Sequence, residues 1–238
     1  MTDNPRIVLA ADELTAEELL RLLKIVGSRL YAVKIHNLYD EHGSEVIRWL
    51  KNYVHRVWVD AKLHDIPNTV ALRAKALKNA GADILTVHAS GGIDMMNAAR
   101  EHGPAEVYGV TVLTSLNDEQ ALEIYCRFVE EEVLRLARLV NVTGLNGLVC
   151  SPNELEPIRL DSGIRPSIKL VTPGIRSAGA HAGDQQRIAT PGLAIRNGAS
   201  LLVIGRPITQ AQNPLLALEQ IEVEIATALL PKPQEGAQ

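Results

Sequence analysis

The chain has 238 residues, 46% of them hydrophobic, and its 24 basic and 28 acidic residues give a net charge of −4. That size fits one large α/β domain or two small ones. The small negative charge and the absence of a long basic run argue against a nucleic-acid or anionic-membrane partner. The N-terminal residues lack a basic-then-apolar signal pattern, no apolar run is long enough to span a bilayer, and Cys126 and Cys150 match no metal or redox spacing. We therefore expect a cytoplasmic protein.

Short apolar runs alternate along the chain with longer amphipathic segments. Strands are predicted, in chain order, at Ile7–Asp12, Tyr31–His36, Val57–Leu63, Ile84–Ala89, Val107–Thr114, Gly147–Ser151, Ile168–Pro173 and Leu201–Arg206. Helices are predicted between and after them at Thr15–Val26, Tyr39–Lys51, Pro67–Ala80, Ile93–Glu101, Asp118–Val140, Gln186–Asn197 and Asn213–Leu230. The last residues, 231–238, are predicted to be a frayed tail.

Strands that alternate with helices predict a parallel sheet, which can be an open doubly wound sheet or a closed (β/α)8 barrel. Three features favour the barrel: the eight predicted strands, the length of 238 residues, and the lack of a G-x-G-x-x-G turn after the first strand. No linker or low-complexity segment interrupts the pattern. We therefore expect residues 1–238 to form a single (β/α)8 TIM barrel domain.

Polar residues recur where the predicted strands end, which is where a (β/α)8 barrel carries its catalytic groups. Asp12 ends the first strand, Lys34 lies near the end of the second, and Asp60 and Lys62 end the third. Asp12 by itself could equally cap the helix that begins near Thr15. Four charges of alternating sign on one rim are harder to explain structurally, and mutual attraction would keep each of them ionised.

Two later segments have the features of a phosphate site. The seventh strand leads into TPGIRSAGAHAGDQQR, a loop too long for a simple connection, which carries Arg176 and Gln185. The eighth strand ends at Gly205, which permits close backbone approach, and Arg206, which suits bidentate phosphate contact. Because the loops after strands seven and eight commonly bind phosphate in this fold, we expect a phosphorylated substrate.

Other chemistries are less well supported by the sequence. The histidines lack H-x-H and H-E-x-x-H spacing, so no metal site is expected. Asp60 and Asp65 could hold magnesium, but Lys62 between them would compete for the same carboxylates. Lys62 could form a Schiff base, although flanking aspartates favour its charged, non-nucleophilic form. No G-x-S-x-G segment marks a serine nucleophile.

Several motifs together resemble the orotidine 5′-monophosphate decarboxylase family. The segment DAKLHDIPNT at 60–69 matches that family's D-x-K-x-x-D-I-x-x-T signature, and its remaining blocks follow in order as LTS at 113–115, TPGIR at 172–176, GDQ at 183–185 and GRPIT at 205–209. The resemblance runs from about Ile7 to Pro214. The D-x-K-x-x-D core alone is shared with related sugar-phosphate decarboxylases and synthases. The DIPNT extension and the TPGIR and GDQ segments make the resemblance specific.

The resemblance implies a homodimeric barrel that converts orotidine 5′-monophosphate to UMP and carbon dioxide, the last step of de novo UMP synthesis, without metal or organic cofactor. It implies that Lys62 is the proton donor, flanked by Asp60 and by Asp65 of the neighbouring subunit. The other implied contacts are Lys34 and Asp12 with the ribose, Ile66 and Thr69 across the subunit interface, Thr114 with the pyrimidine, and Gln185 and Arg206 with the phosphate, with Gly205 and Arg176 nearby. Two departures from the family pattern are His36, where glycine is common, and Glu13.

This reaction would explain the charged array. Loss of carbon dioxide from C6 of the ring leaves an electron pair that the ring delocalises poorly, so the protein must stabilise the charge electrostatically. Lys62 would oppose that charge and then protonate it, while Lys34 and Asp65 would hold Lys62 in place. One alternative is a magnesium-dependent sugar-phosphate decarboxylase or synthase on the same barrel. Another is a catalytically silent nucleotide-binding or scaffold protein, for which a broken array would be expected.

Overall fold

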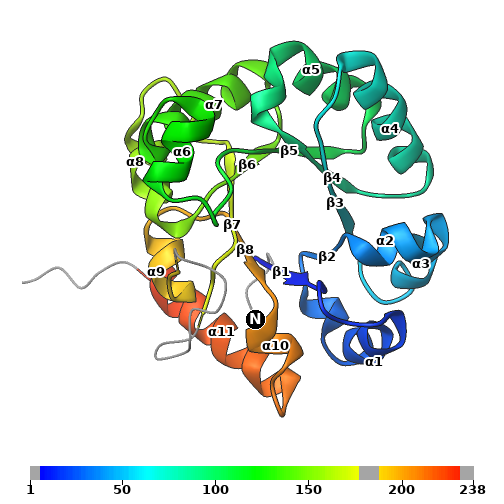
Figure 1. Ribbon diagram of the computed structural model, residues 1–238. Coiled ribbons are helices and arrows are strands. Elements are labelled where there is room, and N and C mark those ends of the chain that lie inside the picture. Colours follow the sequence, from blue (N-terminus) through cyan, green and yellow to red (C-terminus); the bar gives the residue numbers. More distant parts are fainter. Residues whose placement is uncertain (1–5, 177–187, 231–238) are drawn as a thin grey trace, which may run out of the picture.

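The computed structural model describes residues 6–176 and 188–230. Parallel strands form a closed barrel in the order β1 to β8, and helices surround it (Figure 1). The strands are β1 (Ile7–Ala10), β2 (Ala32–Ile35), β3 (Val57–Leu63), β4 (Ile84–His88), β5 (Glu106–Val110), β6 (Gly147–Val149), β7 (Lys169–Thr172) and β8 (Leu201–Ile204). Because β1 pairs with both β2 and β8, the open sheet is excluded and the predicted (β/α)8 barrel is confirmed.

Helices follow the strands on the outside of the barrel. They are α1 (Ala16–Val26), α2 (Asn37–His42), α3 (Ser44–Leu50), α4 (Pro67–Asn79), α5 (Gly92–His102), α6 (Asp118–Tyr125), α7 (Val129–Thr143), α8 (Leu155–Leu160), α9 (Pro191–Arg196), α10 (Arg206–Thr209) and α11 (Pro214–Leu229). No helix among the described residues is both long and apolar enough to cross a membrane. The predicted frayed tail at 231–238 lies outside the described residues.

Two of the helix predictions are wrong, because each of these segments forms two shorter helices in the structure. The segment predicted at Tyr39–Lys51 divides at Gly43, whose φ of 59° interrupts the helix between α2 and α3. The segment predicted at Asp118–Val140 divides at Cys126, which adopts the left-handed conformation after α6. The short helices α8 and α10 were not predicted.

The strands sort their side chains with a period of two, as a barrel requires. Val8, Ala10, Trp58 and Tyr108 belong to a buried cluster inside the barrel, and a second, larger cluster lies between the strands and the helices. Trp58 and Tyr108 meet edge to face with 5.4 Å between ring centroids. Strand β5 ends at Val110, so the strand predicted to reach Thr114 is too long, and Thr114 lies in the loop before α6.

The amino end of the barrel is filled by a polar network. Glu106 accepts hydrogen bonds from Tyr31 at 2.6 Å and from Lys169 at 2.8 Å, and Tyr108 also donates to its carboxylate. These groups come from residues at or near the beginning of β2, β5 and β7. With the amino end filled in this way, the carboxyl ends of the strands are left as the place where a ligand can enter.

Candidate active site

The third strand changes register where its charges begin. Val59 pairs with Leu85 and Leu63 pairs with Val87, so residues 60–62 of β3 lie opposite Thr86 alone on β4. Lys62 within this bulge has a φ of 43°, a left-handed conformation that is uncommon for a residue other than glycine. The bulge directs the side chains of Asp60 and Lys62 toward the pocket at the carboxyl end of the barrel. Backbone strain of this kind clusters at functional sites.

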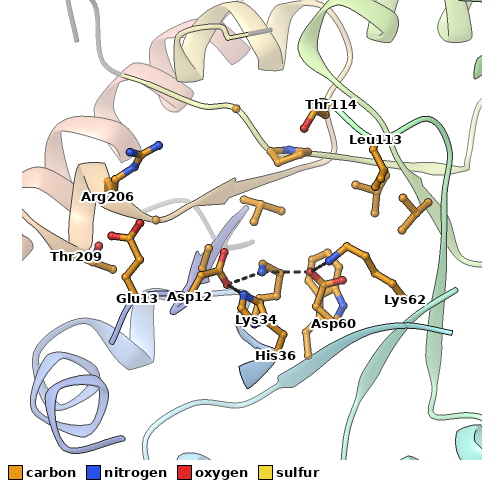
Figure 2. Close-up of a pocket in the computed structure, with 18 of the residues that line it drawn as sticks. Asp12, Glu13, Lys34, His36, Asp60, Lys62, Leu113, Thr114, Arg206 and Thr209 are labelled. Carbon is orange, nitrogen blue, oxygen red and sulfur yellow. Dashed lines mark hydrogen bonds and ion pairs between the residues drawn. The ribbon is translucent and has the colours of Figure 1, made fainter. Parts of the chain in front are cut away.

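The four charges predicted to share one rim form a continuous alternating array (Figure 2). Lys34 Nζ lies 2.6 Å from Asp12 Oδ1 and 3.2 Å from Asp60 Oδ2. Lys62 Nζ lies 2.7 Å from the same Oδ2 of Asp60. In this order, the Lys34 ammonium separates the carboxylates of Asp12 and Asp60, and the Asp60 carboxylate separates the two ammonium groups.

Attraction within the array outweighs the cost of burying it. Burial alone would raise the pKa of the Asp60 carboxyl, but Lys34 and Lys62 lower it to about 2. Burial alone would lower the pKa of the Lys34 ammonium, but Asp60 and Asp12 attract that charge and the pKa is raised. Both groups are thus held ionised at neutral pH. The pKa of His88 is also lowered, mainly by burial and to a smaller extent by the charges of His64 and Lys62.

Asp12 faces the pocket and does not cap a helix. Thr15 caps α1 itself in a capping box with Glu18, so the alternative explanation for Asp12 is wrong. His36, one of the two departures from the family pattern, lies with Nε2 3.2 Å from Asp12 Oδ1. Its Nδ1 accepts the backbone N–H of Asn37 at 2.6 Å. His36 thus places a ring nitrogen beside Asp12 at the edge of the pocket.

The pocket above the barrel has a volume of about 420 Å³. Arg206, at the start of α10, and Lys62 lie at opposite sides of it (Figure 2). Gly205, Arg176 and Thr114 also line the pocket. Such an arrangement suits a ligand that carries an anionic group at one end and reacts beside Lys62 at the other.

Glu13, the second departure, closes one side of the arginine end. It lines the pocket, and its Oε2 accepts a hydrogen bond from Gln210 Nε2 at 3.1 Å. This bond links the loop after β1 to the segment after α10. Glu13 thus adds a negative charge to the same rim as Arg206.

Three predicted site residues are not brought to the pocket of their own chain. Asp65 is exposed, and its Oδ1 accepts the neighbouring N–H of Ile66 at 2.7 Å. Ile66 is 66% exposed, and Thr69 is half-buried on α4. Of the described residues that line the pocket, none is Asp65, Ile66 or Thr69. The predicted phosphate contact Gln185 lies outside the described residues.

Some residues of the site were not predicted from the sequence, and two of them lie close to the array. Trp58 forms part of the pocket floor. Thr86, fully buried on β4, donates a hydrogen bond to Asp60 Oδ1 at 2.6 Å. The only signal for Thr86 is a polar residue at an inward position in the middle of a strand, between the apolar residues Leu85 and Val87.

The donor set around Asp60 does not favour a metal ion. Among the described residues, no group of three or more histidine, cysteine, aspartate or glutamate side chains could hold one. Both oxygens of Asp60 already have partners, Thr86 on Oδ1 and the two lysines on Oδ2. Two ammonium groups at that carboxylate would also repel a divalent cation.

Comparison with known proteins identifies the family. The sequence profile described as "Orotidine 5'-phosphate decarboxylase / HUMPS family" matches residues 5–221. The chain belongs to this family. Among its relatives, the orotidine 5′-phosphate decarboxylase of Actinobacillus succinogenes is 40% identical over 93% of this chain and 98% of its own length. That of Haemophilus ducreyi is 42% identical over 93% of this chain and 99% of its own.

Solved structures of family members have the same barrel. The orotidine 5′-phosphate decarboxylase from Lactobacillus acidophilus superposes with a TM-score of 0.77 at 34% identity, covering 93% of this chain and 99% of that one. The enzyme of that name from Pyrococcus horikoshii gives a TM-score of 0.77 at 31% identity, over 92% and 99% of the two chains.

Proposed function

We propose that this member of the family decarboxylates orotidine 5′-monophosphate to UMP and carbon dioxide, the last step of UMP biosynthesis. The observation that carries the proposal is the array Asp12–Lys34–Asp60–Lys62, which lies across the pocket from Arg206. An array with an ammonium at its reactive end suits a reaction in which negative charge develops on carbon. Full-length relatives named for this activity support the assignment.

In the proposed mechanism, Gln185 and Arg206 bind the substrate phosphate, with Gly205 and Arg176 nearby. The pyrimidine then reaches Thr114 and presents C6 to Lys62. The bond between C6 and the carboxylate breaks, carbon dioxide leaves, and the electron pair remains on C6. Lys62 opposes that charge and transfers one proton from Nζ to C6, which completes UMP.

The remaining array members act on Lys62 and the substrate. Lys34 and Asp12 bind the ribose, and Lys34 and Asp65 hold Lys62 in place, while Asp60 pairs directly with the Lys62 ammonium. The carboxylate of Asp60 lies beside the departing carboxylate and disfavours its ground state. The reaction needs no metal ion and no organic cofactor, because Lys62 supplies both the charge and the proton.

The site is shared between two subunits of a cytoplasmic homodimer. Asp65 of one subunit completes the array of the other, and Ile66 and Thr69 line the same site across the interface. The exposure of Asp65 and Ile66 in the single chain supports this arrangement. A closed two-fold dimer repeats such a contact in both sites.

The alternative, a magnesium-dependent sugar-phosphate decarboxylase or synthase, is not favoured. Enzymes of that kind share the barrel and the D-x-K-x-x-D core, but they would need the Asp60 carboxylate to bind the metal. Here that carboxylate is paired with two lysines. The names of the similar proteins also favour the nucleotide reaction.

One assay tests the proposed function. Purified protein is mixed with orotidine 5′-monophosphate, and loss of the substrate's ultraviolet absorbance is followed together with release of carbon dioxide. We expect one UMP and one carbon dioxide for each substrate consumed, no change after dialysis against a chelator, and no turnover by Lys62→Ala. Inactivity of the wild-type protein, or activity that disappears on chelation and returns with magnesium, would contradict the proposal.

A further inference from the structure

The bulge in β3 leaves a backbone donor that a regular ladder would have paired. Residues 60–62 lie opposite one residue of β4, so their N–H groups cannot all find carbonyl partners on that strand. A buried backbone N–H without a partner is costly. The N–H of Lys62 bonds instead to a side chain, the hydroxyl of Thr86, at 3.3 Å.

The same hydroxyl has a second partner on the other side of the bulge. Thr86 Oγ1 donates its proton to Asp60 Oδ1 at 2.6 Å while it accepts from the Lys62 N–H. With Oδ1 engaged, Asp60 presents Oδ2 to both lysines, 3.2 Å from Lys34 Nζ and 2.7 Å from Lys62 Nζ. One oxygen atom thus contacts both the backbone of Lys62 and the carboxylate that holds its ammonium.

From this geometry we propose that Thr86 is a positioning residue of the reaction: its hydroxyl holds Lys62 in the left-handed backbone conformation and selects which oxygen of Asp60 faces the lysines. The inference rests on the proposed function, because Lys62 and Asp60 act there. Thr86 itself is fully buried and is not among the described residues that line the pocket. Any effect on catalysis must therefore pass through Asp60 and Lys62.

The backbone conformation explains why this hydroxyl matters. A left-handed conformation is sterically unfavourable for a residue with a Cβ, so Lys62 adopts it only where other contacts hold it. Loss of the Thr86 hydroxyl removes one such contact and frees Asp60 to rotate about its terminal torsion, which is intrinsically soft. Displacements of about 1 Å at a reacting group can cost roughly 10²-fold in rate.

The test compares variants that differ by the hydroxyl alone. Thr86→Val keeps the shape of the threonine side chain but removes its hydroxyl. Thr86→Ser and Thr86→Ala form a second pair of smaller side chains, of which only serine has a hydroxyl. The matched control is Thr143→Val, which removes another buried threonine hydroxyl, one bonded to the carbonyl of Val140 on α7. For each protein, kcat, KM, the affinity for UMP and the thermal midpoint are measured.

We expect Thr86→Val and Thr86→Ala to lose at least about tenfold in kcat, with UMP affinity changed by less than about threefold. Thr86→Ser should recover most of the kcat lost by Thr86→Ala, and Thr143→Val should keep the wild-type kcat whatever its thermal midpoint. The ¹³C resonance of the Asp60 carboxyl adds a readout that is independent of turnover, since Thr86→Val should raise the pKa of that group by removing one of its donors.

Three outcomes would overturn the inference. The first is a folded Thr86→Val with a kcat within twofold of wild type. The second is equal kcat for Thr86→Ser and Thr86→Ala, which also decides the matter if Thr86→Val does not fold. The third is an unchanged Asp60 titration. A wild-type protein that does not consume orotidine 5′-monophosphate would instead contradict the proposed function, and the Asp60 titration would still test the Thr86 geometry.

Discussion

Lys34 is the most enclosed cation of the array, with a side chain 8% exposed between two carboxylates. Taking such an ion out of water costs several kcal/mol, and the cost is offset only by close partners of opposite charge. Asp12 and Asp60 are those partners. Removing either would leave a buried charge poorly compensated, so each residue of the array depends on its neighbours for stability as well as for chemistry.

Arg206 carries the first prediction at the level of single residues. Arg206→Ala should weaken UMP binding by roughly 2–5 kcal/mol, because the phosphate charge loses its main partner. Binding of uridine, which lacks the phosphate, should change little. Calorimetric titration of both ligands checks this, with Arg196→Ala on the exposed end of α9 as the control. Equal losses for the two ligands would show that Arg206 does not contact the phosphate.

Two elements depart from regular geometry where the chain needs a special conformation. The bulge in β3 brings Asp60 and Lys62 onto one side of the pocket. Between α6 and α7, Cys126 adopts φ 55° and ψ 31°, and its N–H bonds to the carbonyl of Leu122. The bulge lies at the site, where strain accompanies function, whereas Cys126 is exposed and not among the described residues that line the pocket.

The break between α6 and α7 carries a stability prediction. Cys126→Gly should raise the free energy of unfolding by about 0.5–1 kcal/mol, because glycine adopts the left-handed conformation without the steric cost of a Cβ. Urea denaturation measures the change. The control is another left-handed helix end, Gly144 after α7, where Gly144→Ala should destabilise the protein. A lower stability for Cys126→Gly would show that the cysteine side chain contributes more than the strain costs.

At the scale of the whole molecule, the barrel places some of the predicted site residues away from its own pocket. Asp60 and Lys62 lie in the pocket, but Asp65 follows the strand and is exposed beside Ile66. An exposed apolar side chain next to an exposed carboxylate suits a surface that docks on another subunit. In the proposed homodimer, the side chains of Asp65 and Ile66 would both lie at the subunit interface.

Mixing two inactive variants tests whether the site is shared. Lys62→Ala chains and Asp65→Ala chains are mixed in equal amounts and allowed to exchange subunits. Each mixed dimer then has one doubly altered site and one site with both residues intact. Random exchange should restore about one quarter of the wild-type activity, because half of the dimers are mixed and each has one working site.

The control for this experiment is each variant incubated alone, which should stay inactive. Native mass spectrometry follows the exchange independently of activity. Exchange without restored activity would show that Asp65 serves its own subunit, and the shared site would then be wrong.

The sequence by itself determined the barrel and the four members of the charged array. Strand and helix periodicity is a local property, so eight alternating units could be counted directly, and β3 was predicted with its observed bounds. Asp12, Lys34, Asp60 and Lys62 followed from a rule of the fold, that the carboxyl ends of parallel strands meet on one rim. Position along the chain was enough to place these residues on that rim, although the bulge in β3 sets how Asp60 and Lys62 face the pocket.

Only the tertiary structure decided where regular geometry is interrupted and what compensates for it. The ends of α2 and α6 depend on backbone conformations at Gly43 and Cys126 that the hydrophobic pattern does not record. The bulge in β3 depends on its pairing with β4, and the partner of Asp60 is Thr86, 26 residues further along the chain. Such contacts join segments far apart in sequence, and it is the register between strands that determines which atoms meet.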